Sequence, residues 1–489
     1  MIAVRLECAG PMNMQAKRKE TFLLVAIFLA VFFGPPEETR AETIDAGSCE
    51  QSVVQETIHG AASGDTVNVP AGTCAWGDGE EVIVSGNYAY PSINIDKALT
   101  LAGDSTVITG TGEGYFIVFM PADFPPNPPL RVTGFAFDGS GARAGIFFTY
   151  SSDDSTVQDE IRIDHNVFRN MNGQSIWING QRGVVDSNAF LDVPYPFRFA
   201  SGDSEDWWNG WEGIVFGGED NNLYVEDNII ETTDIVTDCQ YGNRYAFRYN
   251  TITVSAASYP MFDMHGNQGT GYMWACFGGE IYGNEIRMVE GQLLDQRAGK
   301  TVVHHNAAIG ATGSAWAVKV REEVWDTYNP STNAQPQHVS ASYYWNNRED
   351  FSGSLLGSYL SENVCGASID DDAPTCDDAM HGYSLNENDE WFQDSPSFDG
   401  TSGIGCGTLA GRPATCSPGV GYWATDQSCT DLSGMVGANP ENPISGTLFR
   451  CVAADTWEAY YSPYFYPHPM RAGDPGITRP SAPGNLVVS

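Results

Sequence analysis

The middle of the chain repeats a short pattern: an asparagine, any residue, and then an apolar residue within a strand-like run. The repeat occurs at Asn166, Asn188, Asn228, Asn250, Asn284 and Asn306, with a further candidate in Trp345-Asn346-Asn347. Successive asparagines, counted to Asn346, are 22, 40, 22, 34, 22 and 40 residues apart. The interval of 22 occurs three times, and each longer interval is one such unit plus an insertion.

A period near 22 residues with short strand-like runs excludes helical repeats, which need about 33 residues or more. Leucine-rich repeats share this period, but their Leu-x-x-Leu-x-Leu frame is missing. The pattern therefore predicts a parallel β-solenoid whose coils bury a continuous apolar core. We expect the asparagine to occupy an equivalent turn in each coil, to tolerate left-handed geometry there, and to hydrogen-bond the asparagine of the next coil.

The region before the repeat predicts a helix followed by strands. Val54, Ile58 and Ala61 fall on one helical face, and Gly64-Asp65 ends that helix. We expect a strand at 66–69, a turn at 70–73 and the next strand at 98–103.

The run from Ile58 to Thr73, followed by Leu99-Thr100-Leu101-Ala102-Gly103, resembles the opening of parallel β-helix proteins of the pectate-lyase-like superfamily. The resemblance covers roughly residues 44 to 350. It implies an all-β fold: a right-handed, single-stranded parallel β-helix with an N-terminal cap helix and a disulfide-rich C-terminal region. It does not imply one activity, because this superfamily contains lyases, hydrolases, epimerases, phage tailspikes and adhesins.

Both ends of the chain differ from the solenoid. Lys17-Arg18-Lys19, the 12 apolar residues from Phe22 to Phe33, and Thr39-Arg40-Ala41 have the order of a secretory signal, so we expect residues 1–41 to be removed. After the solenoid (42–350) we expect a cysteine-rich cap module at 351–471 and a Pro-rich linker at 472–489. Pro480 to Val488 resembles the first strand of a fibronectin type III module, which would make this chain part of a longer protein; the alternative is an ordinary Pro-rich tail.

Ten cysteines remain after the expected signal, an even number that favours disulfides in an oxidising compartment. They are Cys49, Cys74, Cys239, Cys276, Cys365, Cys376, Cys406, Cys416, Cys429 and Cys451. No spacing among them suggests a zinc site. The sequence leaves their connectivity open, with Cys365–Cys376 as a local pair to test.

Composition narrows the classes of function. The chain has 62 acidic and 24 basic residues, a formal net charge of −38, which argues against nucleic-acid binding and against a polybasic membrane surface. Hydrophobic residues make up 42% of the chain, enough for a sizeable core. The partner that we expect is a polysaccharide or a cell-surface glycan, outside the cell, at the cell surface or in the periplasm.

Three insertions, after Phe190, Ile252 and Ala308, contain the unusual chemistry of the chain, and insertions in a solenoid often build its binding surface. Tryptophan is the most unusual residue type in these insertions. Tryptophan faces stack on sugar rings, so these residues are candidates for carbohydrate binding. The candidates are Trp207, Trp208, Trp211 and Trp274. The alternative is that Trp207, Trp208 and Trp211 cap the core beneath a loop.

The stretch from Glu226 to Asn267 is similar in layout to the core of the alginate lyase and chondroitinase B family. In that family a Lys precedes such a strand and Arg-His-Gly follows on the next coil. Here no Lys occurs between Lys97 and Lys300, Met264 stands in place of the Arg, and only His265 and Gly266 match, so the Lys/Arg mechanism is not expected. The resemblance leaves His265 as a candidate base. The side chains that we expect near it are Asp263, Tyr241, Arg244 and Arg248. The alternative is a structural histidine.

A second group of charged residues would bind a sugar carboxylate or form a buried ion network. It consists of Lys319, Arg321 and Glu322, with Asp295 and Arg297 one coil earlier. Asp234 and Asp238 are candidate ligands for calcium, although no Asp-rich loop of the EF-hand kind is present.

Two classes of function remain. The first is a secreted β-helix enzyme, a lyase or a hydrolase, that binds and cleaves an acidic polysaccharide. The second is a non-catalytic glycan-binding adhesin or an envelope protein. They are distinguished by whether Tyr241, Arg244, His265 and the tryptophan loop meet in one groove.

Overall fold

The computed structural model describes residues 41–84, 87–119, 130–148, 158–179, 181–200, 217–220, 222–240, 242–255, 260–266, 275–288, 292–310, 318–321, 339–356, 360–362 and 385–472. The expected signal up to residue 40 and the fibronectin-like strand lie outside these residues, as do Cys365 and Cys376. Among the described residues, no helix is long and apolar enough to cross a membrane.

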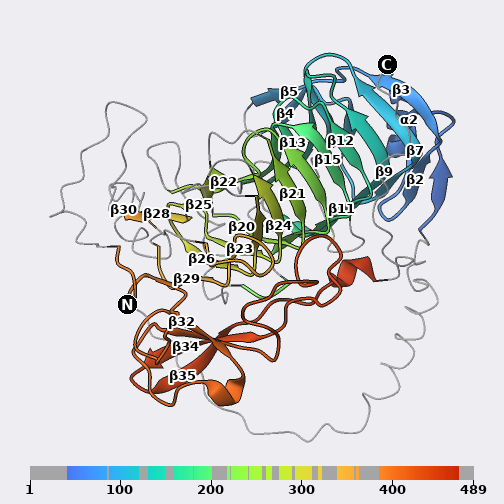
Figure 1. Cartoon of the computed structure of the whole chain (residues 1–489). Coiled ribbons are helices and arrows are strands. Elements are labelled where there is room, and N and C mark those ends of the chain that lie inside the picture. The colour runs from blue at the N-terminus through green and yellow to red at the C-terminus, as the bar shows by residue number, and fades with distance from the viewer. Residues whose placement is uncertain are drawn as a thin grey trace, which may run out of the picture. The chain divides into compact units, whose positions relative to one another are not determined.

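Short parallel strands form three stacks, in which each turn of the chain adds one strand to each stack (Figure 1). The first stack runs through β1 (Thr43–Asp45), β2 (Thr66–Val69), β7 (Thr100–Gly110), β9 (Leu130–Asp138), β11 (Gln158–Asp164), β14 (Gln181–Asp186), β17 (Leu223–Glu226), β20 (Arg244–Arg248), β23 (Gly278–Tyr282), β26 (Lys300–His304), β29 (Ser342–Trp345) and β31 (Trp391–Gln393). The second runs through β3 (Gly72–Trp76), the later halves of β7 and β9, β12 (Val167–Arg169), β15 (Ala189–Val193), β18 (Ile229–Thr232), β21 (Thr251–Val254), β24 (Glu285–Met288) and β27 (Ala307–Ile309).

The third stack is a sheet of ten strands. Its strands are β6 (Ile93–Ile95), β8 (Gly114–Phe119), β10 (Arg143–Phe148), β13 (Gln174–Asn179), β16 (Tyr195–Ala200), β19 (Thr237–Cys239), β22 (Pro260–Met264), β25 (Gln292–Gln296), β28 (Val318–Arg321) and β30 (Leu360–Glu362). A β4–β5 hairpin (Val82–Val84 and Asn87–Ala89) lies between β3 and β6 in the chain. The three stacks together confirm the expected parallel β-helix.

The expected cap helix is α2 (Gln51–Gly60). Val54 and Ile58 are fully buried on its inner face, where the helix packs against β2, β3 and β6. The helix ends four residues earlier than the Gly64-Asp65 signal indicated, and the following strand lies at the expected residues 66–69.

The repeated asparagines form a ladder between the first and second stacks. In each coil the backbone N–H and the Nδ2 amide of one asparagine both donate to Oδ1 of the asparagine in the next coil, at 2.8 to 3.3 Å. The ladder runs through Asn166, Asn188, Asn228, Asn250, Asn284, Asn306 and Asn347. The expected hydrogen bonding is confirmed, and the seventh member is Asn347 rather than Asn346.

The expected left-handed geometry belongs to the residue before each asparagine. His165, Ser187, Asp227, Tyr249, Gly283, His305 and Asn346 all have φ between 50° and 68°. The turn therefore requires a positive φ one position earlier than we expected. The asparagine itself is held by its ladder bonds.

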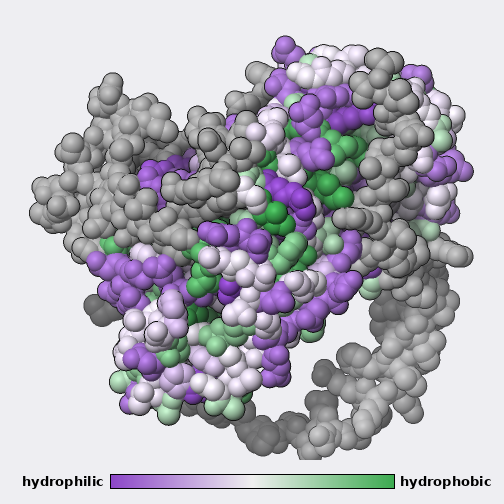
Figure 2. Space-filling view, in the orientation of Figure 1, coloured by the Kyte–Doolittle hydropathy of each residue, from purple (hydrophilic) through white to green (hydrophobic). Residues whose placement is uncertain are grey.

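Aromatic side chains stack in register inside the solenoid. Phe137, Phe168 and Phe190 follow one another in the second stack, with ring centroids 5.5 and 5.1 Å apart. The outer side of the second stack is partly apolar, since Val167, Leu191 and Ile229 are half-buried there. Figure 2 shows apolar residues over these strands among hydrophilic ones.

Parallel stacking continues beyond residue 350, because β30 pairs with β28 and β31 pairs with β29. A small sheet follows, made of β32 (Ile404–Gly407), β33 (Gly421–Ala424), β34 (Thr447–Ala453) and β35 (Thr456–Tyr461), with short 3-10 turns at Leu409–Gly411 and Pro469–Arg471. Within the described ranges, four disulfides join Cys49–Cys74, Cys239–Cys276, Cys406–Cys429 and Cys416–Cys451. They confirm the expected disulfide use for eight of the ten cysteines.

Candidate functional site

Two rows of outward-facing side chains run along the third stack. Alternate residues of a strand point to opposite faces, so a residue next to a core position points outward. The first row follows the strand register through Trp177, Arg198, Asp238, Asp263, Asp295 and Lys319. The second row lies two residues later in each coil and contains Asn179, Ala200, Gln240, His265, Arg297 and Arg321.

Three carboxylates therefore occupy successive coils of the first row. Neighbouring strands lie about 4.8 Å apart, and like charges at that spacing repel unless opposite charges compensate them. Compensation comes from the second row, which places His265, Arg297 and Arg321 beside Asp238, Asp263 and Asp295. We call these six residues the third-stack cluster.

His265 lies between two carboxylates. Its Nε2 is 3.2 Å from Asp238 Oδ1 and 3.0 Å from Asp263 Oδ2, and its side chain is 17% exposed. Because the ring is held by acids of two different coils, its orientation is fixed by the stacking of the solenoid. A histidine oriented by a carboxylate is the arrangement that general acid–base catalysis uses.

Arginines hold the other sides of the cluster. Arg297 donates from Nε to Asp263 Oδ1 at 3.1 Å, and its Nε is 3.9 Å from Asp295 Oδ2. Arg321 forms a two-pronged contact with Asp295, at 2.9 and 2.6 Å. Such bidentate pairs are among the strongest charge-assisted hydrogen bonds, so they fix the carboxylates in place.

Asp238 has further partners on the N-terminal side of the cluster. Gln240 donates from Nε2 to both of its carboxylate oxygens, at 2.9 and 2.7 Å, and the Tyr195 hydroxyl also hydrogen-bonds it. Arg198 Nε lies 3.9 Å from Asp238 Oδ2, and its guanidinium lies over the Trp177 ring at 4.4 Å from the centroid. This cation–π contact holds the Arg198 guanidinium at the edge of the cluster.

The protonation states differ among these groups. Burial alone would raise the pKa of Asp263, but His265 and Arg297 outweigh it and lower that pKa to about 2. Burial raises the pKa of Asp295, although Arg321 and Arg297 oppose it. Burial, together with the charge and hydrogen bond of Asp238, raises the pKa of Tyr195 well above its ordinary value. The cluster thus contains a carboxylate that stays ionised, Asp263, and lies beside a phenol that keeps its proton, Tyr195.

Positive charge is concentrated along the two rows. Among the described residues of the two rows between β16 and β28, Arg198, Arg297, Lys319 and Arg321 give four permanent positive charges against three carboxylates, and His265 adds a fifth when protonated. The next strand, β30, places Glu362 in register with Arg321. The whole chain has the opposite balance, with 24 basic and 62 acidic residues. A local excess of this kind attracts an anionic ligand.

A metal ion fits this cluster less well than an anionic ligand. Asp238, Asp263 and His265 could offer ligand atoms that lie within 4.8 Å of one another. Calcium takes six to eight oxygen ligands, whereas this group contains an imidazole and its carboxylates already bind His265, Gln240 and Arg297. Asp234, the other expected calcium ligand, is outside this group; it lies in the bend before β19.

The structure brings together only some of the expected site residues. His265, Asp263, Asp295, Arg297, Lys319, Arg321 and Asp238 share the outer side of the third stack. Asp263, Lys319 and Arg321 belong to regular strands rather than to projecting insertions, and His265 directly follows one. The remaining expected site residues, apart from Arg244, Arg248 and Asp234, lie outside the described residues: Trp207, Trp208, Trp211, Tyr241, Trp274 and Glu322.

Arg244 and Arg248 are not grouped with His265, because both project from β20 on the first stack. Buried Arg244 faces the charges of Glu219 and Glu280, and burial is the largest influence that lowers its pKa, to about 10. Arg248 is fully buried, and its Nε donates to Glu226 Oε2 at 2.8 Å.

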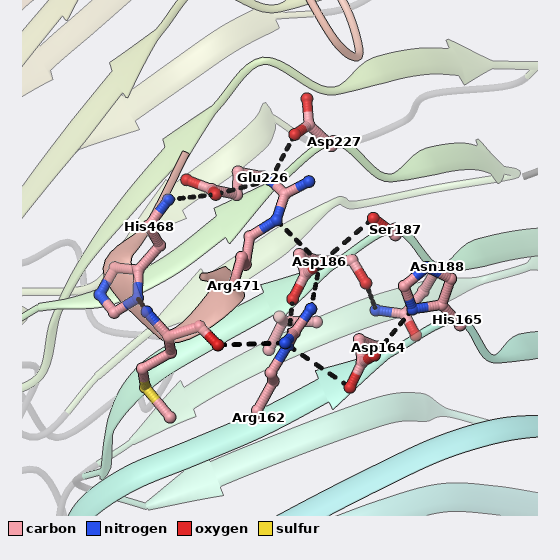
Figure 3. Close-up of polar contacts among 12 residues, drawn as sticks. Arg162, Asp164, His165, Asp186, Ser187, Asn188, Glu226, Asp227, His468 and Arg471 are labelled. Atoms are coloured by element: carbon pink, nitrogen blue, oxygen red, sulfur yellow. Dashed lines mark hydrogen bonds and ion pairs between the residues drawn. The ribbon is translucent and has the colours of Figure 1, made fainter. Parts of the chain in front are cut away.

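Arg248 belongs to a buried ionic network on the outer side of the first stack. Figure 3 shows other members of this network, among them Arg162, Asp186, Glu226 and Arg471. A row in register contains Asp164, Asp186, Glu226, Arg248, Tyr282, His304 and Trp345. The C-terminal segment 464–472 lies over it. Backbone carbonyls of Tyr464 and Phe465 accept hydrogen bonds from Arg248, at 2.8 and 2.7 Å.

Arg471 completes this network. Its guanidinium contacts Asp186 at 3.1 Å, Glu226 at 2.7 Å, and Asp227. With it, four carboxylates (Asp164, Asp186, Glu226 and Asp227) meet four guanidinium groups (Arg131, Arg162, Arg248 and Arg471). We call these eight residues the first-stack network.

Trp177, Tyr195, Arg198 and Gln240 were not among the expected site residues. A signal for two of them is present in the sequence, because Trp177 and Arg198 follow their ladder asparagines by 11 and 10 residues. Asp238 follows Asn228 by 10 and Asp295 follows Asn284 by 11. Counting from each asparagine would have aligned the row.

The chain matches no protein family and no curated protein. Among solved structures it is similar to the A-module of a mannuronan C-5 epimerase from Azotobacter vinelandii, with 12% sequence identity and a TM-score of 0.28. The alignment covers 67% of this chain and 99% of that one.

Proposed function

We propose that this protein binds an acidic polysaccharide along the third stack and cleaves it by β-elimination, with His265 as the base. The observation that carries the proposal is the excess of positive charge around an oriented histidine in a chain with a net charge of −38. A neutral glycan would gain little from that field, whereas a uronate-containing chain would be attracted to it.

Two residues of the cluster and three of its neighbours have roles in this reaction. His265 takes the proton from the ring carbon beside the uronate carboxylate, and Asp263, which stays ionised, orients the ring and stabilises its positive charge. The released electron pair forms a carbon–carbon double bond as the glycosidic C–O bond breaks. Tyr195 retains a proton that the leaving oxygen can accept. Arg198 and Lys319 offset the negative charge of the substrate.

Hydrolysis fits the geometry less well. Glycosidases hold two carboxyl groups about 5 to 9.5 Å apart, with one of them protonated. Asp238 and Asp263 are bridged by a single nitrogen, and Asp263 has a pKa of about 2. Asp238 is also bound by the Gln240 amide. Neither carboxyl group is therefore placed to act as the acid or as the nucleophile of a glycosidase.

Two observations favour a second function, binding without turnover. Arg244 projects from the first stack, so it does not meet His265 in one groove as the enzyme class required. Every carboxylate of the third-stack cluster is bound by a positively charged or amide group of its neighbours. A fully paired surface of this kind would suit a glycan-binding adhesin or an envelope protein as well as an enzyme.

We place the protein outside the cell, at the cell surface or in the periplasm, after removal of an N-terminal signal. Four disulfides support this location, because disulfides persist in oxidising compartments. The proposed mechanism uses protein side chains alone; calcium at Asp238 stays a prediction, which a chelator tests.

The test is a screen of matched acidic and neutral polysaccharides with the purified mature protein, in calcium and in chelator. Elimination creates an unsaturated uronate, so ultraviolet absorbance that grows with time on acidic chains alone is the expected result. New reducing ends without absorbance would indicate hydrolysis instead. Binding without either signal would leave the glycan-binding function, and no binding would contradict the proposal.

A further inference from the structure

The backbone around His265 is held by the two halves of one disulfide. The His265 N–H donates to the Cys239 carbonyl at 2.9 Å, and the Cys276 N–H donates to the His265 carbonyl at 2.8 Å. Cys239 and Cys276 are joined through their sulfurs. His265 therefore lies between two half-cystines, with a backbone hydrogen bond to each.

The same disulfide also fixes the acid beside His265. Asp238 accepts a hydrogen bond from the Gln240 amide, and Cys239 lies between these two residues in the chain. The disulfide at Cys239 therefore holds the backbone on which both side chains are carried. Cys239 and Cys276 are completely buried in the core of the solenoid, on the inner side of the strands whose outer side holds the cluster. The two cysteines are 37 residues apart, and the coil that contains β20, β21 and β22 lies between them in the sequence.

The other three disulfides have no such contact with the cluster. Cys49–Cys74 joins the cap helix region to β3, and Cys406–Cys429 and Cys416–Cys451 lie within the C-terminal sheet region. None of these six cysteines is adjacent in sequence to a residue of the third-stack cluster or hydrogen-bonds one in the described part of the chain.

We propose that the Cys239–Cys276 disulfide is a positioning element for His265, so that the cluster reaches its working geometry only in the oxidised protein. Reduction by two equivalents of an external thiol would convert this disulfide to two cysteine thiols and the reagent to its own disulfide. The two hydrogen bonds around His265 would then depend on backbone packing alone. The proposal rests on the proposed function for its effect on turnover, but not for its effect on the backbone.

The test compares two double variants of the full mature chain. Cys239→Ala/Cys276→Ala removes the bond beside His265. Cys406→Ala/Cys429→Ala removes a bond between two cysteines that are 23 residues apart in the C-terminal sheet region. Alanine avoids an unpaired hydroxyl in the core. On the acidic substrate we expect kcat of the first variant to fall on the order of 10–100-fold with KM nearly unchanged, since small misplacements of a catalytic group have that cost. The control should keep its kcat.

Amide hydrogen exchange supplies a readout that needs no turnover. In the first variant the His265 and Cys276 amides should exchange at least about tenfold faster, while the Phe168 amide of β12 should stay protected, because its coil is far along the stack. The control variant should leave all three amides unchanged. If the alanine variant fails to fold, graded reduction of the natural protein replaces it, with the free thiols counted by mass spectrometry. Reduction of Cys239–Cys276 should then give the same faster exchange at His265 and Cys276.

The two proposals can fail separately. Absence of turnover by the natural protein, with the local exchange change present, would overturn the enzyme and keep the positioning role. Unchanged exchange at His265, or a uniform increase along the solenoid, would overturn the positioning role even if the protein is an active lyase.

Discussion

The first and third stacks of the solenoid each present a row of charged side chains, and the chain completes the two rows in different ways. On the first stack, the C-terminal segment adds Arg471, so four carboxylates meet four guanidinium groups, and all of them except the 30%-exposed Arg131 are buried. On the third stack, four permanent positive charges face three carboxylates among the described residues from β16 to β28, and His265 stays partly exposed. A balanced, covered row stabilises the fold, whereas a row with excess charge can bind a ligand.

The comparison also separates two uses of histidine. His304, in the first-stack row, is fully buried and stacks between Tyr282 and Trp345 at 4.7 and 4.2 Å. Burial lowers its pKa well below the ordinary value, so it stays neutral at physiological pH. His265 instead contacts two carboxylates beside solvent. Only the second environment suits proton exchange with a substrate.

The largest expected effect comes from exchanging these two histidines for glutamine. His265→Gln should lower kcat by about 10²–10⁴-fold, the usual contribution of a general base, and leave the free energy of unfolding within about 1 kcal/mol. His304→Gln should do the reverse, lowering stability by about 1–3 kcal/mol without changing kcat of the folded protein. Kinetics and urea unfolding of both variants measure this. Loss of stability in His265→Gln with no kinetic effect would assign both histidines to structure.

The second effect concerns the charge balance of the covered row. Arg471→Met removes one of four guanidinium groups, so Asp227 loses its guanidinium partner while Asp186 and Glu226 keep only Arg162 and Arg248, which should lower the free energy of unfolding by about 3–5 kcal/mol. Arg287→Met is the matched control, because that arginine is 55% exposed and pairs only with Glu285 among the described residues, so a change within about 0.5 kcal/mol is expected. Urea denaturation compares them. Equal effects would show that the covered row is not a stabilising network.

Both rows have fixed places relative to the asparagine ladder, which explains what the sequence could predict. The ladder repeats in the linear sequence, so the period, the solenoid and the asparagine bonds were predictable. Residues two before each asparagine, such as Asp186 and Glu226, build the first-stack row, and residues 10 to 13 after it build the third-stack row. Arg248 precedes Asn250 whereas His265 follows it, so the two lie on different stacks.

The remaining features depend on contacts between distant segments. Arg471 reaches Glu226 across 245 residues, and no local pattern marks that meeting. The left-handed position was misassigned for a different reason. Asparagine favours that geometry in isolation, but here its amide is used by the ladder, and the residue before it makes the turn.

A pH titration should distinguish the two rows by sign. Burial raises the pKa of Asp186 to about 6 despite Arg471 and Arg162, so this group binds protons more readily in the folded state, and its contribution is lost as the pH rises from about 4 to 6. Asp263 has a pKa of about 2, below its unfolded value of 3.8, so its contribution is present above about pH 4 and lost as the pH falls toward 2.

Asparagine variants isolate these terms. Asp186→Asn should remove a pH dependence of about 3 kcal/mol between pH 4 and 6, and Asp263→Asn one of about 2 kcal/mol between pH 4 and 2. Urea unfolding at a series of pH values measures both. Two variants that changed the pH profile in the same window and direction would contradict the assigned environments.

The smallest expected effect tests whether the excess positive charge of the third stack selects its ligand. Arg198 is 22% exposed, and Trp177 holds its guanidinium beside Asp238. Arg198→Gln should weaken binding of an acidic oligosaccharide by about 3–10-fold at low ionic strength, because one partly screened charge contributes about 1 kcal/mol. The difference should shrink at about 0.5 M salt, where the screening length falls below 10 Å.

Titration calorimetry with acidic and neutral oligosaccharides of equal length measures the effect of Arg198→Gln, and Arg287→Gln on the second stack serves as the control. Equal loss for both oligosaccharides would mean that Arg198 shapes the surface rather than reading charge, and the contrast between a balanced and an unbalanced row would then no longer explain ligand choice.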